Sequence, residues 1–321
     1  MALERLSILQ KFSPFCHPEN IRGMLIGNDL DALLSACLLK TQFGWDVVGF
    51  YDYQNLWCSP PQSVFIDNLL NGHYLAVDMD IYHPAIPSIG HHIITLSRNE
   101  KLPGQRLSLN PNLLRGISLQ NFQAKYPLAT IHLLLYLFDV KFSQNDSELL
   151  IWLADSTFIN GQSHRFRSNV HDWLSNFLPS DYLLNTFAII DTPSFEERLK
   201  DKILEPLQMA QLALPVGQIT SRHLKLSGFQ CQWHTFPDAL PKINQLVEFI
   251  HAYTNWAKIS LPRNLKCLPG KRQKMRLTNV FPKYPNLTAF LEAQQVFSFV
   301  FPFAGVINFT NGFPQMYQSL P

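Results

Sequence analysis

The first half of the chain alternates between short apolar runs and stretches with a helical hydrophobic period. Short apolar runs bounded by glycine or polar residues are typical of buried strands. Four such runs predict strands at residues 22–27, 46–53, 63–67 and 73–80. After the first run, apolar residues recur with the spacing of a helix that has one apolar face. These positions are Leu30, Leu33, Leu34, Cys37 and Leu38.

Two further apolar segments, residues 129–138 and 147–158, predict buried helices. Strands that alternate with helices predict an α/β fold with a parallel sheet. From about residue 190 the pattern changes to a long amphipathic helix over residues 194–214 and a strand-like end, QVFSFVFPFAGVINFT. We expect three parts: an α/β domain, a connector, and a smaller α+β domain that binds substrate or a partner. Their predicted ranges are 1–190, 191–214 and 215–321.

Composition narrows the class of protein. The 321 residues are 46% hydrophobic and carry a net charge of +2, so any nucleic-acid surface would have to be local. The five cysteines form no CxxC pair, which argues against a disulfide framework and a structural zinc site. The start, MALERLSILQKF, lacks a signal-peptide pattern, and the longest apolar runs are too short to span a membrane. We expect a soluble, cytoplasmic protein without a membrane partner.

Carboxylates lie where predicted strands end. Asp29 and Asp31 follow the first strand, and Asp78 and Asp80 close the fourth. Ligands of parallel sheets bind at the carboxyl ends of the strands. Close carboxylates repel one another, and a divalent cation is the partner that offsets this repulsion most fully. Replacing Asp31 or Asp78 with alanine should therefore abolish any activity that depends on this cation and modestly raise the melting temperature of the metal-free protein.

Imidazoles follow these acids in the segment SIGHHIIT, which contains His91 and His92. Oxygen ligands suit Mg²⁺ and Mn²⁺, and added imidazole favours Mn²⁺. A further acid, Asp155, lies in the apolar segment LLIWLADST. The sequence therefore indicates a centre for a hard divalent metal.

The order of these motifs resembles the DHH phosphoesterase family. The first motif is LIGNDLDALLSACLL, the second YLAVD, the third GHH and the fourth LLIWLADST. The dipeptide Asn110-Pro111 and the segment YPLAT between the third and fourth motifs are also similar to family features. The resemblance covers roughly residues 20 to 190. It implies a DHH-type, Rossmann-like N-terminal domain and a metal-dependent hydrolase.

The resemblance also implies roles for individual residues. Asp29 and Asp31 would each ligate one of two Mn²⁺ ions, with Mg²⁺ as the alternative metal, and Asp78 would bridge them. His91 and Asp155 would complete the shell of the second ion, while His92 would face the substrate phosphate. Two such ions would activate the attacking water and stabilise the leaving oxygen.

Three departures from the family pattern bear on these roles. The histidine that many members carry shortly before the first aspartate is missing, since residues 25–28 read LIGN, which leaves Asn28 as a candidate oxygen ligand for the first metal. Gly90 replaces the first aspartate of the Asp-His-His motif, a residue that orients more than it ligates. The short spacing to the histidines leaves Asp67, Asp78 and Asp80 as candidates for the bridging acid, with Asp78 favoured and Asp80 behind it.

Cationic residues that would contact the substrate phosphate follow the fourth motif and recur near the C-terminus. They are Arg165, Arg167, Lys271 and Arg272, with Arg98 and Arg106 as further candidates. Lys271 and Arg272 belong to a predicted basic loop, residues 268–278, which lies near aromatic residues in the sequence. Such a mixture suits single-stranded nucleic acid.

We therefore expect a phosphoesterase acting on a nucleotide-type phosphodiester, such as an exonuclease (nuclease) or oligonucleotide phosphodiesterase. One alternative is an inactive DHH-fold scaffold that binds nucleic acid or a protein partner, including a second copy of the chain. Another is a phosphatase or pyrophosphatase that acts on small molecules.

Overall fold

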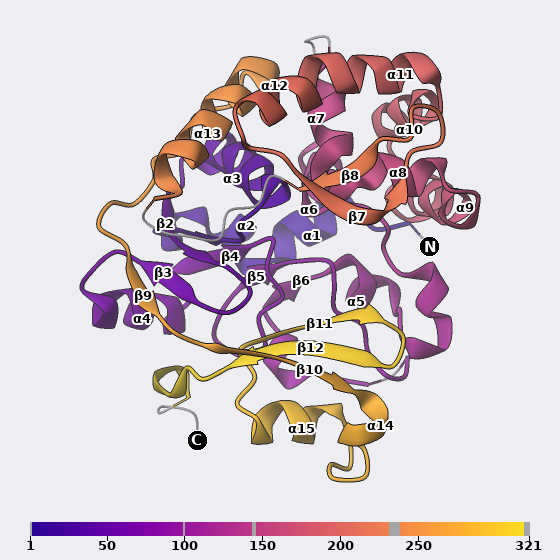
Figure 1. The fold of residues 1–321 in the computed structure, drawn as a ribbon. Helices are drawn as coiled ribbons and strands as arrows, with labels where there is room; N and C mark the ends of the chain where they lie inside the picture. The colour runs from indigo at the N-terminus through magenta and orange to yellow at the C-terminus, as the bar shows by residue number, and fades with distance from the viewer. Residues whose placement is uncertain (1, 99, 143–145, 231–237, 318–321) are drawn as a thin grey trace. The chain divides into compact units, whose positions relative to one another are not determined.

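The computed structural model describes residues 2–98, 100–142, 146–230 and 238–317 (Figure 1). The chain forms two compact units, each assembled from three separate segments. Unit 1 contains Met1–Leu9, Asn28–Gly44 and Tyr126–Ile259, and unit 2 contains Gln10–Gly27, Trp45–Lys125 and Ser260–Pro321. The domain boundaries predicted at residues 190 and 214 stay predictions.

Unit 2 contains a seven-stranded sheet in the order β6-β5-β4-β1-β2-β3-β9. The strands are β1 (Gly23–Ile26), β2 (Val47–Tyr51), β3 (Leu56–Cys58), β4 (Tyr74–Val77), β5 (Ser88–Ile89), β6 (Ser108–Leu109) and β9 (Lys266–Leu268). Neighbouring strands from β6 to β2 are parallel, whereas β3 pairs antiparallel with both β2 and β9. The mostly parallel sheet confirms the predicted α/β class.

The central strands form where the sequence has continuous apolar runs. All four residues of β1 are buried, which is the pattern of a parallel strand covered on both faces. Ile26 of β1 is paired with Val77 of β4, and the Gly27 amide donates to the Val77 carbonyl at 3.2 Å. The two strands therefore end at the same level, and Asp78 follows directly at this carboxyl edge of the sheet.

The strand predicted at residues 63–67 was wrong, because this segment belongs to helix α4 (Gln62–Leu70). Phe65 and Leu69, four residues apart, are its buried residues, so the run has a helical period. A short apolar run cannot by itself distinguish a buried strand from one turn of a helix. Asp67 is exposed on α4, which removes the strand end that made it a candidate ligand.

The C-terminal segment of unit 2 forms a second, antiparallel sheet in the order β10-β12-β11. Its strands are β10 (Lys271–Arg276), β11 (Ser298–Phe303) and β12 (Val306–Asn311). The strand-like C-terminal end is confirmed by β11 and β12, whereas the basic loop predicted at residues 268–278 contains the edge strand β10. Short helices complete the unit. They are α2 (Ser13–Cys16), α5 (Pro111–Arg115), α14 (Leu277–Val280) and α15 (Leu287–Ala293).

Unit 1 is mainly helical. Its helices are α3 (Leu30–Phe43), α6 (Thr130–Phe138), α7 (Ser147–Leu153), α8 (Thr157–Gln162), α9 (His164–Asp172), α10 (Asp181–Ile189), α11 (Pro193–Arg198), α12 (Glu205–Met209) and α13 (Leu240–Thr254). Strands β7 (Leu214–Thr220) and β8 (Ser227–Gln230) form an antiparallel pair, and α1 (Arg5–Lys11) begins in this unit. Among the described residues, no helix combines the length and the apolar character that crossing a membrane requires.

Capping residues fix where helix α3 begins and ends. The Asp29 side chain caps the start by accepting from the Ala32 amide at 3.1 Å. Gly44 ends the helix in the left-handed conformation, with φ of 81°. The sequence predicted one apolar face, but every residue from Leu30 to Leu39 is buried. Helix α3 is therefore a core helix of unit 1.

The other helix predictions agree with the structure in part. Residues 129–138 correspond to α6. The segment 147–158 is divided into α7 and α8 by Asp155 and Ser156, which both have positive φ. The long amphipathic helix predicted over 194–214 extends from α11 through a π-helical segment, Leu199–Leu204, to α12, and β7 starts at Leu214.

Candidate metal centre

In unit 1, Asp31 binds the start of helix α6. Its Oδ2 accepts from the Thr130 amide at 2.7 Å and its Oδ1 from the Ile131 amide at 2.9 Å. These are two of the first amides of α6, which have no partner within their own helix. Asp31 is fully buried, and Ser35 Oγ also lies within 3.4 Å of its carboxylate. Asp31 therefore stabilises a helix that is distant in the sequence.

The repulsion expected among these acids is present in unit 1. Burial raises the pKa of Asp31 well above its usual value, and the negative charges of Asp155 and Asp29 raise it further. The two α6 amides act in the opposite direction. The structure thus brings Asp29, Asp31 and Asp155 into one electrostatic neighbourhood. A cation bound there would relieve the same repulsion.

Asp155 lies at a break in the helix rather than on a regular helical face. It has φ of 50°, and the next residue, Ser156, has φ of 51°. Left-handed conformations cost non-glycine residues roughly 1–3 kcal/mol each, although aspartate adopts them more readily than most. Such strain is commonly found at functional sites.

In unit 2, Asp78 and His91 form a close pair at the carboxyl edge of the parallel sheet. Asp78 Oδ1 lies 3.6 Å from His91 Nδ1, and both side chains are buried. Two atoms that each bind one ion at about 2.1 Å lie roughly 3–4 Å apart, so this separation suits a shared ion. Asp78 also has a left-handed backbone, with φ of 56°, immediately after β4.

The rings of His91 and His92 lie close together, tilted by 44° to each other. Their ring centroids are 3.8 Å apart, and a nitrogen of each ring lies within 4.8 Å of the other. Burial, assisted by the positive charge of Lys125, lowers the pKa of His91 from 6.5 to about 3. His91 is therefore neutral at physiological pH, which is the form that ligates metals.

Asp80 contacts the backbone of the histidine pair. Its Oδ2 accepts from the His92 amide at 2.9 Å, and its Oδ1 accepts from Asn110 Nδ2 at 2.8 Å. Burial raises the pKa of Asp80 to about 6, against the opposing effect of these hydrogen bonds and of Lys125. Lys125 is itself buried, which lowers its pKa to about 8, and its Nζ donates to the Phe301 carbonyl at 2.9 Å.

The Asn110-Pro111 dipeptide supports the same pair. Asn110 caps α5 by accepting from the Asn112 amide at 2.9 Å. Asn112 Nδ2 in turn donates to the His91 carbonyl at 2.7 Å. Sequence reasoning noted the dipeptide but missed Asn112 and Lys125. The signal for α5 was present, because asparagine before proline is a common helix start.

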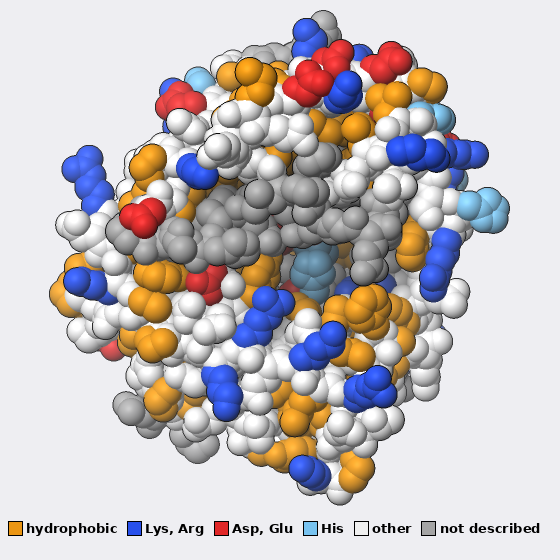
Figure 2. Space-filling model, in the orientation of Figure 1, with side chains coloured by type: hydrophobic (Ala, Val, Ile, Leu, Met, Phe, Trp, Pro, Cys, Tyr) orange, Lys and Arg blue, Asp and Glu red, His pale blue; other side chains and the backbone are white. Residues whose placement is uncertain are grey.

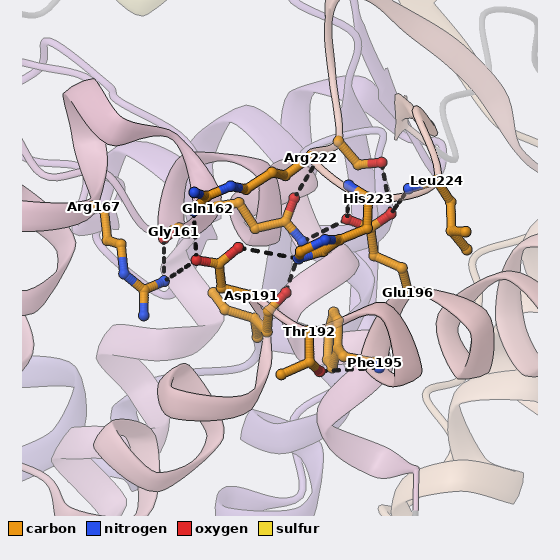
Figure 3. A network of polar contacts seen from close by, with 12 residues as sticks. Gly161, Gln162, Arg167, Asp191, Thr192, Phe195, Glu196, Arg222, His223 and Leu224 are labelled. Atoms are coloured by element: carbon orange, nitrogen blue, oxygen red, sulfur yellow. Dashed lines mark hydrogen bonds and ion pairs between the residues drawn. The ribbon is translucent and has the colours of Figure 1, made fainter.

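The predicted phosphate-binding arginines of unit 1 have other partners (Figure 3). Arg167 donates to the Gly161 carbonyl at 2.8 Å and lies 3.5 Å from Asp191. Arg222 and His223 also contact Asp191, at 2.9 and 3.2 Å. Arg165 is exposed and stacks on Phe166, at 5.3 Å from the ring centroid. Arg167 therefore belongs to a structural network within this unit.

Beside these arginines, Glu196 is fully buried and ties together the loop that follows β7. It accepts hydrogen bonds from two side chains and two backbone amides (Figure 3). The donors are Gln162 Nε2 at 2.8 Å, Ser221 Oγ at 2.8 Å, the His223 amide at 3.2 Å and the Leu224 amide at 2.7 Å. This carboxylate is satisfied by protein groups and has a structural role.

The remaining predicted cations lie in unit 2. Arg106 lines a cavity of about 410 Å³ together with His17 and His73. Residues shortly before β1, β4, β5 and β6 line this cavity, so it lies at the amino ends of the strands, opposite the edge that carries Asp78. Lys271 and Arg272 are exposed on β10, and Arg272 lies over the Tyr53 ring, 5.6 Å from its centroid.

No protein-family model, no curated protein and no solved structure matches this chain. The DHH resemblance therefore depends on the motifs alone, and the phosphoesterase assignment stays a prediction.

Proposed function

We propose that the chain is a divalent-metal-dependent phosphoesterase of the DHH type that hydrolyses a nucleotide-type phosphodiester. The observation that supports this most strongly is the pair of Asp78 and His91. A buried carboxylate and a neutral imidazole lie 3.6 Å apart at the carboxyl edge of a parallel sheet, where ligands of such sheets bind. A carboxylate together with an imidazole suits Mn²⁺.

Of the three acids of unit 1, Asp29 is the one that the chain connects most directly to β1. Asp29 follows the last residue of β1, Ile26, by three positions. Covalent geometry alone therefore limits the separation of their Cα atoms to about 11 Å. We assign Asp29, Asp31 and Asp155 as the oxygen ligands that complete a two-metal set with Asp78 and His91.

The residues of the chain would divide the work at this centre. When bound, two Mn²⁺ ions, or Mg²⁺ in their place, would supply an activated water and stabilise the leaving oxygen. His91 is held neutral and ready to ligate. His92, which Asp80 fixes through its backbone amide, would contact a phosphate oxygen of the substrate.

A nucleic-acid-type substrate is favoured by the cations of β10. Arg272, Lys274 and Arg276 alternate along the strand and so share one face of the small sheet. They recur about every 6.7 Å along the strand, a regular spacing that suits a charged backbone. Lys and Arg side chains gather over this part of the surface in Figure 2. Phe303 and Phe281, which are 65% and 37% exposed, offer apolar surface for stacking bases.

Metal content and hydrolysis test the proposal together. We expect the purified chain to retain Mn²⁺ after gel filtration and to hydrolyse a short single-stranded oligonucleotide or bis-p-nitrophenyl phosphate. Asp78→Asn should abolish hydrolysis. Asp67→Asn is the matched control, since Asp67 is exposed on α4 and should be replaceable without loss. If no metal binds and no substrate is cleaved, the proposal is rejected.

The second candidate is an inactive scaffold of the same fold that binds nucleic acid or a protein partner. The contact between Asp31 and α6 favours it, because this carboxylate has a structural partner without any metal. Binding of single-stranded nucleic acid without metal uptake or cleavage would select this alternative.

A further inference from the structure

Gly90 precedes the two histidines, and its backbone does not explain why it is glycine. Its φ is outside the left-handed region, so an L-amino acid could adopt the same conformation. A Cβ at this position, however, would lie 2.5 Å from Asp80 Oδ1 and 2.7 Å from its Cγ. The carboxyl group of Asp80 therefore fills the space that a side chain at position 90 would need.

The Asp80 carboxylate cannot easily leave that space. One oxygen accepts from the His92 amide and the other from Asn110 Nδ2. Asn110 is fixed in turn, because its own Oδ1 caps α5 through the Asn112 amide and its Nδ2 must then face Asp80. The side chain of Asp80 is buried at 3% exposure, so water does not compete for these bonds.

The histidine pair is thus held by its backbone on both sides. Asp80 accepts from the amide of His92, and Asn112 donates to the carbonyl of His91. Neither contact uses an imidazole nitrogen, so both act on the backbone of the pair alone. The absence of a side chain at Gly90 is what allows the carboxylate of Asp80 to reach the His92 amide.

We propose that Asp80 is the positioning residue of the His91–His92 pair, and that its carboxylate takes the place of a side chain at position 90. Its effect on metal affinity rests on the metal centre proposed above, whereas its effect on the conformation of the pair does not. Partners that orient metal-ligating histidines typically change metal affinity 10- to 100-fold when removed, which gives the size of the expected effect.

The steric part is tested by a double-mutant cycle on the metal-free chain, read as the urea midpoint of unfolding. Gly90→Ala should lower the midpoint in the natural background, because the new Cβ meets the Asp80 carboxyl. In the Asp80→Gly background the same change should lower the midpoint by less, because only the Met79 carbonyl, 2.8 Å from the Cβ site, still has to shift. Equal effects of Gly90→Ala in both backgrounds would overturn the proposal, and this outcome does not depend on metal binding.

The functional part is tested by moving the carboxylate. Asp80→Gly should weaken Mn²⁺ binding by roughly 10- to 100-fold, measured by calorimetry well below the unfolding temperature. Gly90→Asp alone should also weaken it, since the two carboxyl groups would overlap. The double variant Asp80→Gly/Gly90→Asp restores the sequence Asp-His-His and should recover most of the affinity. The Met79 carbonyl, 2.8 Å from the Cβ site, still has to shift in the double variant, so the recovery should be incomplete.

These outcomes separate the inference from the proposed function. Unchanged Mn²⁺ affinity in Asp80→Gly, or no recovery in the double variant, would overturn the positioning role while leaving the metal centre intact. If the natural chain binds no Mn²⁺, the proposed function fails, and the urea cycle still decides whether Asp80 and position 90 share one space.

Discussion

Replacing Asp31 with alanine separates two opposite expectations about the metal-free protein. Sequence reasoning stressed repulsion between carboxylates and predicted a more stable variant. The structure adds two hydrogen bonds, at 2.7 and 2.9 Å, from the buried amides of Thr130 and Ile131. Leaving a buried donor without an acceptor costs about 1–3 kcal/mol. We therefore expect Asp31→Ala to lose roughly 2–6 kcal/mol of unfolding free energy, less the relief of repulsion.

The pH dependence of this loss follows from the sign of the pKa shift. The pKa of Asp31 is raised in the folded protein above its usual 3.8, so the folded state binds a proton more tightly than the unfolded chain. Natural Asp31 therefore loses stability as pH rises from about 4 through the folded pKa. Since the alanine variant lacks this penalty, the difference between the two proteins should shrink as pH rises.

The assay is urea unfolding of both proteins in the presence of EDTA, at pH 4.5 and pH 7.5, with Asp67→Ala as the exposed control. We expect a clear loss for Asp31→Ala, larger at the lower pH, and little change for the control. An alanine variant more stable than the natural chain at pH 7.5 would show that repulsion outweighs the α6 contact, and would refute this reasoning.

Three further predictions address other parts of the molecule. Glu196→Gln should lose about 2–4 kcal/mol of unfolding free energy, because a buried carboxylate with four donors is replaced, whereas its exposed neighbour Glu197→Gln should change little in the same urea assay. Replacing Arg272, Lys274 and Arg276 together with glutamine should make the slope of log K against log salt concentration for oligonucleotide binding shallower by about two units, the value for three phosphate contacts on a single strand. An unchanged slope would exclude β10 from the interface. Mn²⁺ at a hundredfold excess over its dissociation constant should raise the free energy of unfolding by about 2.7 kcal/mol, measured by thermal unfolding. This stabilisation should become smaller as the pH is lowered, because protons compete with the metal for the carboxylates.

The sequence predicted those elements whose pattern is decided locally. β1 and β4 are continuous apolar runs, and α6 is an apolar segment of helical length, so each was found close to its true bounds. Residues 63–67 were misread, because an apolar run this short fits either period. β10 was missed because an edge strand with exposed cations lacks an apolar face.

The residues of the candidate site could also be predicted only in part. The acids and histidines were visible as residue types at the ends of predicted elements. Their partners were not, because these contacts join distant positions: Asp31 meets Thr130 across 99 residues, and Asp80 meets Asn110 across 30. The reason for Gly90 was also hidden, since its φ would suit other residues and it is the carboxyl group of Asp80, together with the Met79 carbonyl, that excludes them.

The interleaving of the two units has a consequence for how the chain folds as it is synthesised. The chain changes from one unit to the other five times, and unit 1 receives its last segment only at Ile259. The sheet of unit 2 is completed later still, because β3 can pair with its second neighbour, β9, only after Lys266 has been synthesised to pair with Cys58. Unit 1 can finish folding only after Ile259 has been synthesised, and unit 2 only after part of its own last segment has followed. Pairing across such sequence separations is slow, and it leaves the edge of β3 open to wrong partners until β9 has been synthesised.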